Sequence, residues 1–227
     1  MVNIEKEIQS KKDPIQAKTL SRFFKNKKGQ YGEGDIFLGV TVPTLRIIVK
    51  KYYKDISLKD VQELLNSKIH EYRLTALLIL VEKYKEDKEL IYNTYIKNFR
   101  NINNWNLVDL TAPKIMGDFL KDKNRDILYS LATSNNLWEK RISIVATFAF
   151  IKDNDFKDTL KISEILLKDE HDLIHKAVGW MLREVGKRNK DLEKEFLDKY
   201  YRIMPRTMLR YSIEKFDPKE KEFYMKK

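Results

Sequence analysis

The chain has 227 residues, 42% of them hydrophobic, and no apolar run approaches the roughly 20 residues that span a bilayer. It contains no cysteine, which excludes disulfides, a thiol nucleophile and any cysteine-based zinc site. The formal net charge of +11 favours nucleic acid or another polyanion as a partner, although a lysine-rich source organism would give the same excess. The amino-terminal residues carry no secretion signal, so we expect a cytoplasmic protein without a membrane partner.

Apolar periodicity predicts helices along most of the chain, and the five prolines and seven glycines fall mainly between these segments. In chain order, the predicted helices are 3–12, 14–27, 43–54, 58–67, 70–86, 87–99, 105–120, 122–133, 136–152, 156–167, 171–188, 190–201 and 205–216. No segment alternates convincingly as a strand would. The expected fold class is therefore all-α, in a single domain over residues 1–227.

Similar segments recur along the chain, each with a basic residue just ahead of an apolar stretch. The steps are 34, 34, 35 and 34 residues when the markers are Arg73, Leu107, Arg141, Lys176 and Arg210. Such a period is typical of helix-pair repeats, which stack because each repeat is too small to bury its own apolar face. We therefore expect a solenoid with a long concave surface.

Four of the seven glycines fall between Lys27 and Pro43. Their spacing does not match a P-loop, which requires Gly, four residues and then Gly-Lys-Ser/Thr. One interpretation is a plain connection between helices. The other is a mobile basic loop beside a helix start at Thr41–Arg46, whose free N–H groups suit phosphate.

The stretch NNWNLVDLTAPKIM, residues 103–116, combines an aromatic ring, an acid and a helix breaker. The two asparagines can cap a helix start, and Trp105 and Asp109 then share one face because they are four residues apart. Pro113 lacks the N–H that would bond the carbonyl of Asp109, so the helix is expected to bend or loosen there. The ring and the anion together suit a cationic partner. The alternative for Asp109 is a surface carboxylate or a buried ion-pair partner.

The helix predicted over 171–188 has two faces. A core stripe is formed by Ile174, Val178, Met181 and Val185. The opposite face carries Lys176, Trp180, Arg183 and Lys187. A tryptophan is more often a core residue than a site residue, but the helical phase of Trp180 places it among basic residues. There its ring can contact a sugar or a nucleobase of DNA while the basic side chains bind phosphates.

The helix predicted over 136–152 contains a different tryptophan. Trp138 falls on an ordinary apolar stripe, so we assign it to the core. Arg141 is interpreted either as an ion-pair partner of a nearby acid such as Asp109 or as a phosphate clamp, since its planar fork meets phosphate with two bonds.

The three histidines, His70, His171 and His175, form no ligand pattern such as HExxH. We expect no metal and no cofactor, and no nucleophile elbow is visible.

Five segments together resemble the AlkD-type DNA alkylation repair glycosylases, a family of all-helical proteins built from HEAT-like repeats. They are RFFKN (22–26), FLGVTVP (37–43), WNLVD (105–109), LWEKRISI (137–144) and HKAVGWMLREVGK (175–187). The resemblance spans roughly residues 14–216, and the last segment is the most specific. It implies a HEAT-like solenoid with a concave basic groove.

The resemblance also implies a function and a site. Trp105, Asp109 and Trp180 would be the active-site trio, Arg141 a supporting DNA contact and Arg183 a further basic position. Family members excise N3- and N7-alkylated purines, whose rings are cationic, from duplex DNA without flipping the lesion into a pocket. Two positions depart from the family pattern, since Asn104 replaces an aromatic residue and Phe23 a tyrosine.

Selectivity is then expected to come from the positive charge of the lesion, and efficient excision of neutral hypoxanthine would contradict it. The further DNA contacts expected are Lys176, Lys187, Arg46 and Thr41. Two alternatives remain, namely a non-catalytic solenoid that binds branched or distorted DNA and a protein-binding scaffold. We expect a monomer, because an open groove must admit a duplex.

Overall fold

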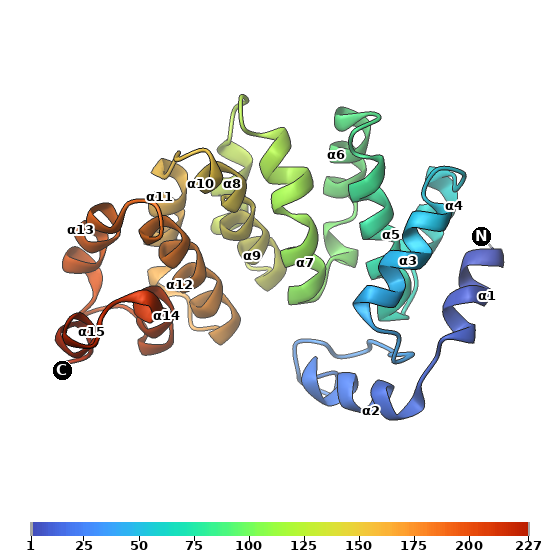
Figure 1. Ribbon diagram of the computed structural model, residues 1–227, viewed down its shortest axis with the longest axis horizontal. Coiled ribbons are helices and arrows are strands. Elements are labelled where there is room, and N and C mark those ends of the chain that lie inside the picture. The colour runs from blue at the N-terminus through green and yellow to red at the C-terminus, as the bar shows by residue number, and fades with distance from the viewer. Residues whose placement is uncertain (1, 227) are drawn as a thin grey trace. The chain divides into compact units, whose positions relative to one another are not determined.

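The computed structural model describes residues 2–226, and most of them are helical (Figure 1). Within this range the only β-type pairing is an isolated bridge between Ile36 and Ile69, so the all-α fold class is confirmed. No helix in the described range combines the length and the apolar character needed to cross a membrane. The chain divides into two compact units, the first ending at Thr111 and the second beginning at Ala112.

The first unit is built around one buried helix. Its elements are α1 (Val2–Ser10), α2 (Pro14–Phe23), α3 (Val42–Tyr52), α4 (Leu58–Leu65), α5 (His70–Lys83), α6 (Lys88–Lys97), a 3₁₀ turn (Phe99–Asn101) and α7 (Trp105–Thr111). Helix α5 packs against α1, α3, α4, α6 and α7. Every residue from His70 to Leu80 is buried, so α5 is the core of this unit.

The second unit is arranged around α12. Its elements are a π-helical turn (Pro113–Gly117), α8 (Asp126–Ala132), α9 (Leu137–Ala146), α10 (Phe148–Lys152), α11 (Lys157–Ile165), a 3₁₀ turn (Leu166–Lys168), α12 (Asp172–Gly186), α13 (Lys190–Tyr200), α14 (Arg206–Ser212), a 3₁₀ turn (Ile213–Lys215) and α15 (Pro218–Met225). Helix α12 packs against α9, α11, α13 and α14. The four residues of its predicted core stripe are fully buried.

Three differences from the predicted helices have local causes. The segment 105–120 changes from α-helix to π-helix after Thr111, as the missing N–H of Pro113 led us to expect. The segment 136–152 is divided at Thr147, whose hydroxyl bonds the Ile144 carbonyl at 2.7 Å and so competes with the helical pattern. Helix α15 was not predicted, although Asp217 followed by Pro218 is a helix-start signal.

The five residues that mark the repeat lie in five different helices. In chain order these are α5, α7, α9, α12 and α14. These helices are not consecutive: one α-helix lies between each pair of them, except that α10 and α11 both lie between α9 and α12. The marked positions therefore recur at about every second helix, the spacing that helix-pair repeats would give.

Candidate functional site

Helix α7 positions Trp105 and Asp109. The buried side chain of Asn104 accepts a hydrogen bond from the backbone N–H of Trp105 at 2.9 Å, which satisfies one free donor at the helix start. Leu107 and Val108 face the core, whereas Trp105 and Asp109 are both partly exposed. The expected shared face of the indole and the carboxylate is therefore present.

The helix loosens immediately after this face. The α-helix ends at Thr111, and the N–H of Gly117 bonds the carbonyl of Ala112 at 2.9 Å across the π-helical turn. Such π turns occur often at functional sites.

Trp105 and Asp109 both line a mainly apolar pocket of about 430 Å³ within the first unit. The Trp105 ring lies edge-on to Phe23, with centroids 5.6 Å apart, and tilted against Phe24 at 5.1 Å. Phe23 is 60% exposed and also lines the pocket, so part of its ring is accessible to a ligand. The remaining walls come from α2, the glycine-rich loop, α3, α5 and α7 itself, and they include Gln16, Leu20, Val40, Val42, Pro43, His70, Glu71, Leu74, Asn106 and Leu110.

A buried polar network lies against one wall of this pocket. Asp35 is paired with Arg73 at 2.6 Å and with Nδ1 of His70 at 3.2 Å, and all three side chains are buried. Burial by itself raises the pKa of Asp35, but the hydrogen bond with His70 and the charge of Arg73 outweigh it, so the pKa lies below its ordinary value. Nε2 of His70 lies 3.0 Å from the side-chain nitrogen of Asn106, on α7. The network thus connects the glycine-rich loop to the helix that carries Trp105.

The glycine-rich loop is anchored by α5. The Glu71 carboxylate accepts backbone N–H groups of Leu38, Gly39 and Val40 at 2.8–3.3 Å. Gly39 has φ +87° and lies so close to the Asp13 carbonyl that an added Cβ would be 2.1 Å from it, so glycine is required there. These contacts give the loop a structural role as the connection between α2 and α3.

Thr41 and Arg46 lie at the start of α3. Thr41 is the N-cap of α3, and its exposed hydroxyl accepts the N–H of Thr44 at 3.5 Å. Thr41 also lines the pocket, whereas Arg46 is partly exposed one turn further along the helix. The structure therefore brings Thr41, but not Arg46, to the pocket of Trp105.

The second unit holds the other candidates, on α12 and α9. Trp180 is partly exposed and lies off the buried stripe, as its phase predicted. Its ring centroid is 5.8 Å from that of Phe148, and its Nε1–H donates to Glu184 at 3.2 Å. Trp138 is 7% exposed, which confirms its assignment to the core.

Each basic residue of the α12 polar face has an acidic partner within the second unit. Lys176 pairs with Asp172 at 2.7 Å, and Lys187 pairs with Glu184 at 2.6 Å. Arg183 pairs with Glu214, which follows α14. The sequence pattern predicted the basic residues but not their acidic partners. A DNA phosphate would have to take the place of each acidic partner.

Arg141 is more buried than a phosphate clamp at a groove edge would be. Its side chain is 5% exposed, and one guanidinium nitrogen donates to the carbonyl of Leu173. This contact fixes α9 against the start of α12.

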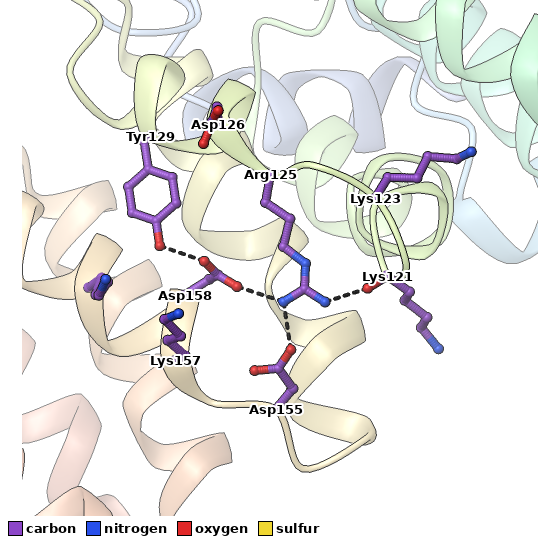
Figure 2. A pocket seen from close by; sticks show the side chains of 9 residues that line it. Lys121, Lys123, Arg125, Asp126, Tyr129, Asp155, Lys157 and Asp158 are labelled. Atoms are coloured by element: carbon purple, nitrogen blue, oxygen red, sulfur yellow. Dashed lines mark hydrogen bonds and ion pairs between the residues drawn. The ribbon is translucent and has the colours of Figure 1, made fainter.

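A second hollow, of about 610 Å³, is lined by lysines and acids of α8, α11 and their flanking turns (Figure 2). Arg125 lines it and is paired with Asp155 and Asp158 at 2.6 Å each, with its guanidinium stacked 3.8 Å from the centroid of Phe150. The Tyr129 hydroxyl donates to Asp158 at 2.5 Å, and burial together with this carboxylate raises the pKa of Tyr129. Because these groups bind one another, we regard this cluster as a structural link between α8 and α11.

The sequence analysis did not predict the side-chain contacts that surround Trp105 and Asn106. Asn106 directly follows Trp105, but nothing local indicates that its partner is His70, 36 residues earlier. The aromatic pair Phe23 and Phe24 was visible in the RFFKN segment, yet its contact with Trp105 is long-range.

Comparisons with known proteins identify the fold and the family of this chain. One solved structure, described as a predicted DNA alkylation repair enzyme from Enterococcus faecalis, superimposes with a TM-score of 0.76 over 92% of this chain and 98% of its own, at 16% identity. At that identity the match shows the fold alone. No curated protein sequence matches the chain. The family model for DNA alkylation repair enzymes matches residues 4–216, so the chain belongs to the DNA alkylation repair enzyme family.

Proposed function

We propose that this protein is a monofunctional DNA glycosylase that hydrolyses the N-glycosidic bond of cationic N3- and N7-alkylated purines in duplex DNA. The observation that carries the proposal is the shared face of Trp105 and Asp109 on α7, where both side chains line one apolar pocket. A ring face and a carboxylate both favour positive charge, and an apolar wall strengthens that preference by excluding water.

The proposed mechanism follows from the leaving group. A cationic purine departs as a neutral base, so no strong acid is needed to protonate it, and positive charge grows on the deoxyribose as the bond stretches. Asp109 stabilises this charge. One charge pair at 4 Å and an effective dielectric of about 20 is worth roughly 4 kcal/mol, or about a thousandfold in rate. That suffices for an activated leaving group but not for a neutral base.

The second unit supplies further contacts in this proposal. Trp180 offers a partly exposed ring to the DNA, and Lys176, Arg183 and Lys187 exchange their acidic partners for phosphates. Arg141 is buried and supports these residues through its hydrogen bond to the start of α12. The partly exposed positions of Trp105 and Trp180 suit contact with an intact duplex from outside, so we propose that the lesion is not flipped.

The test is release of free 7-methylguanine from methylated duplex DNA by the wild type and by Asp109→Asn. We expect release to fall about a hundredfold in the variant, on the order of 3 kcal/mol of transition-state stabilisation, while DNA binding persists. Asp122→Asn, which changes an exposed acid outside the pocket, is the matched control and keeps full activity.

Two results would contradict the proposal. If the wild type binds DNA and releases no base, the protein is a non-catalytic DNA binder. If it excises hypoxanthine as readily as 7-methylguanine, the charge of the lesion is not what it selects.

A further inference from the structure

Asn106 presents an unsatisfied oxygen beside the candidate site. Its side chain is 7% exposed and lines the same pocket as Trp105 and Asp109. Its nitrogen is hydrogen bonded to His70, but its Oδ1 has no hydrogen-bond partner within residues 2–226. A buried carbonyl without a partner costs free energy, so its retention calls for an explanation.

The orientation of this amide follows from the network behind it. The Asp35 carboxylate can only accept, so Nδ1 of His70 carries the proton that lies between them. The side-chain nitrogen of Asn106 can only donate, so Nε2 of His70 is the acceptor of the hydrogen bond between them. Asn106 must donate its N–H to Nε2, which leaves Oδ1 for whatever enters the pocket.

A second acceptor lies one helical turn away. Asn106 and Asp109 are three residues apart on α7, a spacing that makes side chains neighbours, and both line the pocket. A carboxylate has about four lone-pair sites, so Asp109 can accept a further hydrogen bond in addition to its existing contacts. Two acceptors therefore lie on neighbouring residues that line the pocket, and the direction of the buried one, Oδ1 of Asn106, is fixed by the hydrogen bond of its own amide nitrogen. A ligand that matches them has two donor hydrogens and little bulk.

We propose that Asn106 and Asp109 together hold the attacking water, one through each of its hydrogens, and that His70 and Asp35 are positioning residues that keep the Asn106 carbonyl facing it. The proposal rests on the glycosylase function above. The water oxygen forms a bond to C1′ while the bond from C1′ to the purine nitrogen breaks, and its electron pair leaves with the purine, which becomes neutral. The proton released by the water passes to Asp109.

Methanol provides the test, because it has one O–H and can satisfy only one of two acceptors. In water–methanol mixtures the wild type should favour water, giving less methyl deoxyriboside than the solvent ratio predicts. In Asn106→Leu we expect the methanol-derived share to rise at least threefold and single-turnover release of 7-methylguanine to fall roughly ten- to hundredfold, with DNA affinity unchanged. His70→Phe keeps a ring between Phe24 and Phe37 but frees the Asn106 amide, so its shift is in the same direction and smaller. The control is Asn101→Leu, an asparagine outside the pocket bonded to Asn98, which should leave both readouts unchanged.

The outcomes separate the two proposals. An active wild type with an unchanged methanol share in folded Asn106→Leu overturns the water-holding role and leaves the glycosylase function intact, whereas an inactive wild type overturns both. If neither variant folds, a crystal structure of the wild type decides, since an ordered water within hydrogen-bond distance of both Asn106 Oδ1 and the Asp109 carboxylate supports the role and its absence contradicts it.

Discussion

Buried acids in this protein differ in how well they are paired. Asp35, Glu71 and Asp158 each accept hydrogen bonds from bases, backbone N–H groups or a tyrosine hydroxyl. Glu193, on α13, is 2% exposed, and its Oε1 has no hydrogen-bond partner in the described part of the chain. Burial raises the pKa of Glu193 to about 8, although Lys190 and Arg183 act in the opposite direction.

This raised pKa predicts a pH-dependent stability. The folded state holds the Glu193 proton up to about pH 8, whereas the unfolded chain releases it near the ordinary value of 4.5, so raising the pH through that window lowers the free energy of unfolding. Glu193→Gln cannot ionise, and we expect it to raise the melting temperature at pH 9 by roughly 5 °C, or about 2 kcal/mol for a domain of this size. At pH 5 the difference should nearly vanish.

Thermal melts at both pH values check this prediction. Glu195→Gln, which changes an exposed acid on the same helix, is the control and should melt like the wild type at each pH. A Glu193→Gln benefit that is the same at pH 5 and pH 9 would show that ionisation is not its cause.

At the scale of elements, α12 and α14 approach closely through a glycine. A Cβ added to Gly179 would lie 2.4 Å from the Met208 carbonyl oxygen and 2.5 Å from Cβ of Tyr211. Both obstacles belong to α14 and neither is a flexible side-chain end, so the helices would have to separate. This contact explains why glycine occupies the interior of a helix, where it otherwise costs about 1 kcal/mol relative to alanine.

Gly179→Ala should therefore destabilise the protein despite its higher helix propensity. We expect a loss of about 1–3 kcal/mol from overpacking, measured as a lower midpoint of denaturant unfolding. Lys176→Ala, at a partly exposed position inside the same helix, controls for propensity. An unchanged or higher midpoint for Gly179→Ala would mean that α14 can shift away from α12 at little cost in free energy.

For the whole molecule, the excess positive charge indicates DNA binding only where basic residues gather on one face. With 45 lysines and arginines, most bases must simply be solvated. Lys176 and Lys187 lie on the Trp180 side of α12. Asp172, the partner of Lys176, is exposed, and exchanging it for a phosphate costs little, since such pairs are worth about 0–1 kcal/mol. Glu184, the partner of Lys187, is buried and keeps the hydrogen bond from Trp180 when Lys187 turns to a phosphate.

We expect duplex binding to weaken steeply with salt, and the double variant Lys176→Ala, Lys187→Ala to reduce the slope of log K against log salt by about 2. Fluorescence anisotropy over a salt series measures this slope. Lys199→Ala, which removes an exposed base from α13, should reduce it much less. A slope near zero for the wild type would favour the protein-binding scaffold.

Local properties of the sequence determined the positions of most helices and which side chains of each helix face the core. Helices follow from apolar period and from the scarcity of proline and glycine, and the distinction between core Trp138 and partly exposed Trp180 follows from helical phase. Pro113 predicted the loosening after Asp109, because the missing N–H is a property of one residue. The five family-like segments were sufficient to indicate the DNA alkylation repair family.

Only the tertiary structure decided which polar groups meet. Asn106 and His70 are 36 residues apart, Arg73 and Asp35 are 38 apart, and Arg183 and Glu214 are 31 apart. Such pairs depend on how helices pack, which no local period encodes, and the burial of Arg141 has the same origin. The sequence therefore supplied the face of Trp105 and Asp109, whereas the packing of α5 against α7 and the side chains of α2 and α3 made that face a pocket and left the Asn106 oxygen without a partner among the described residues.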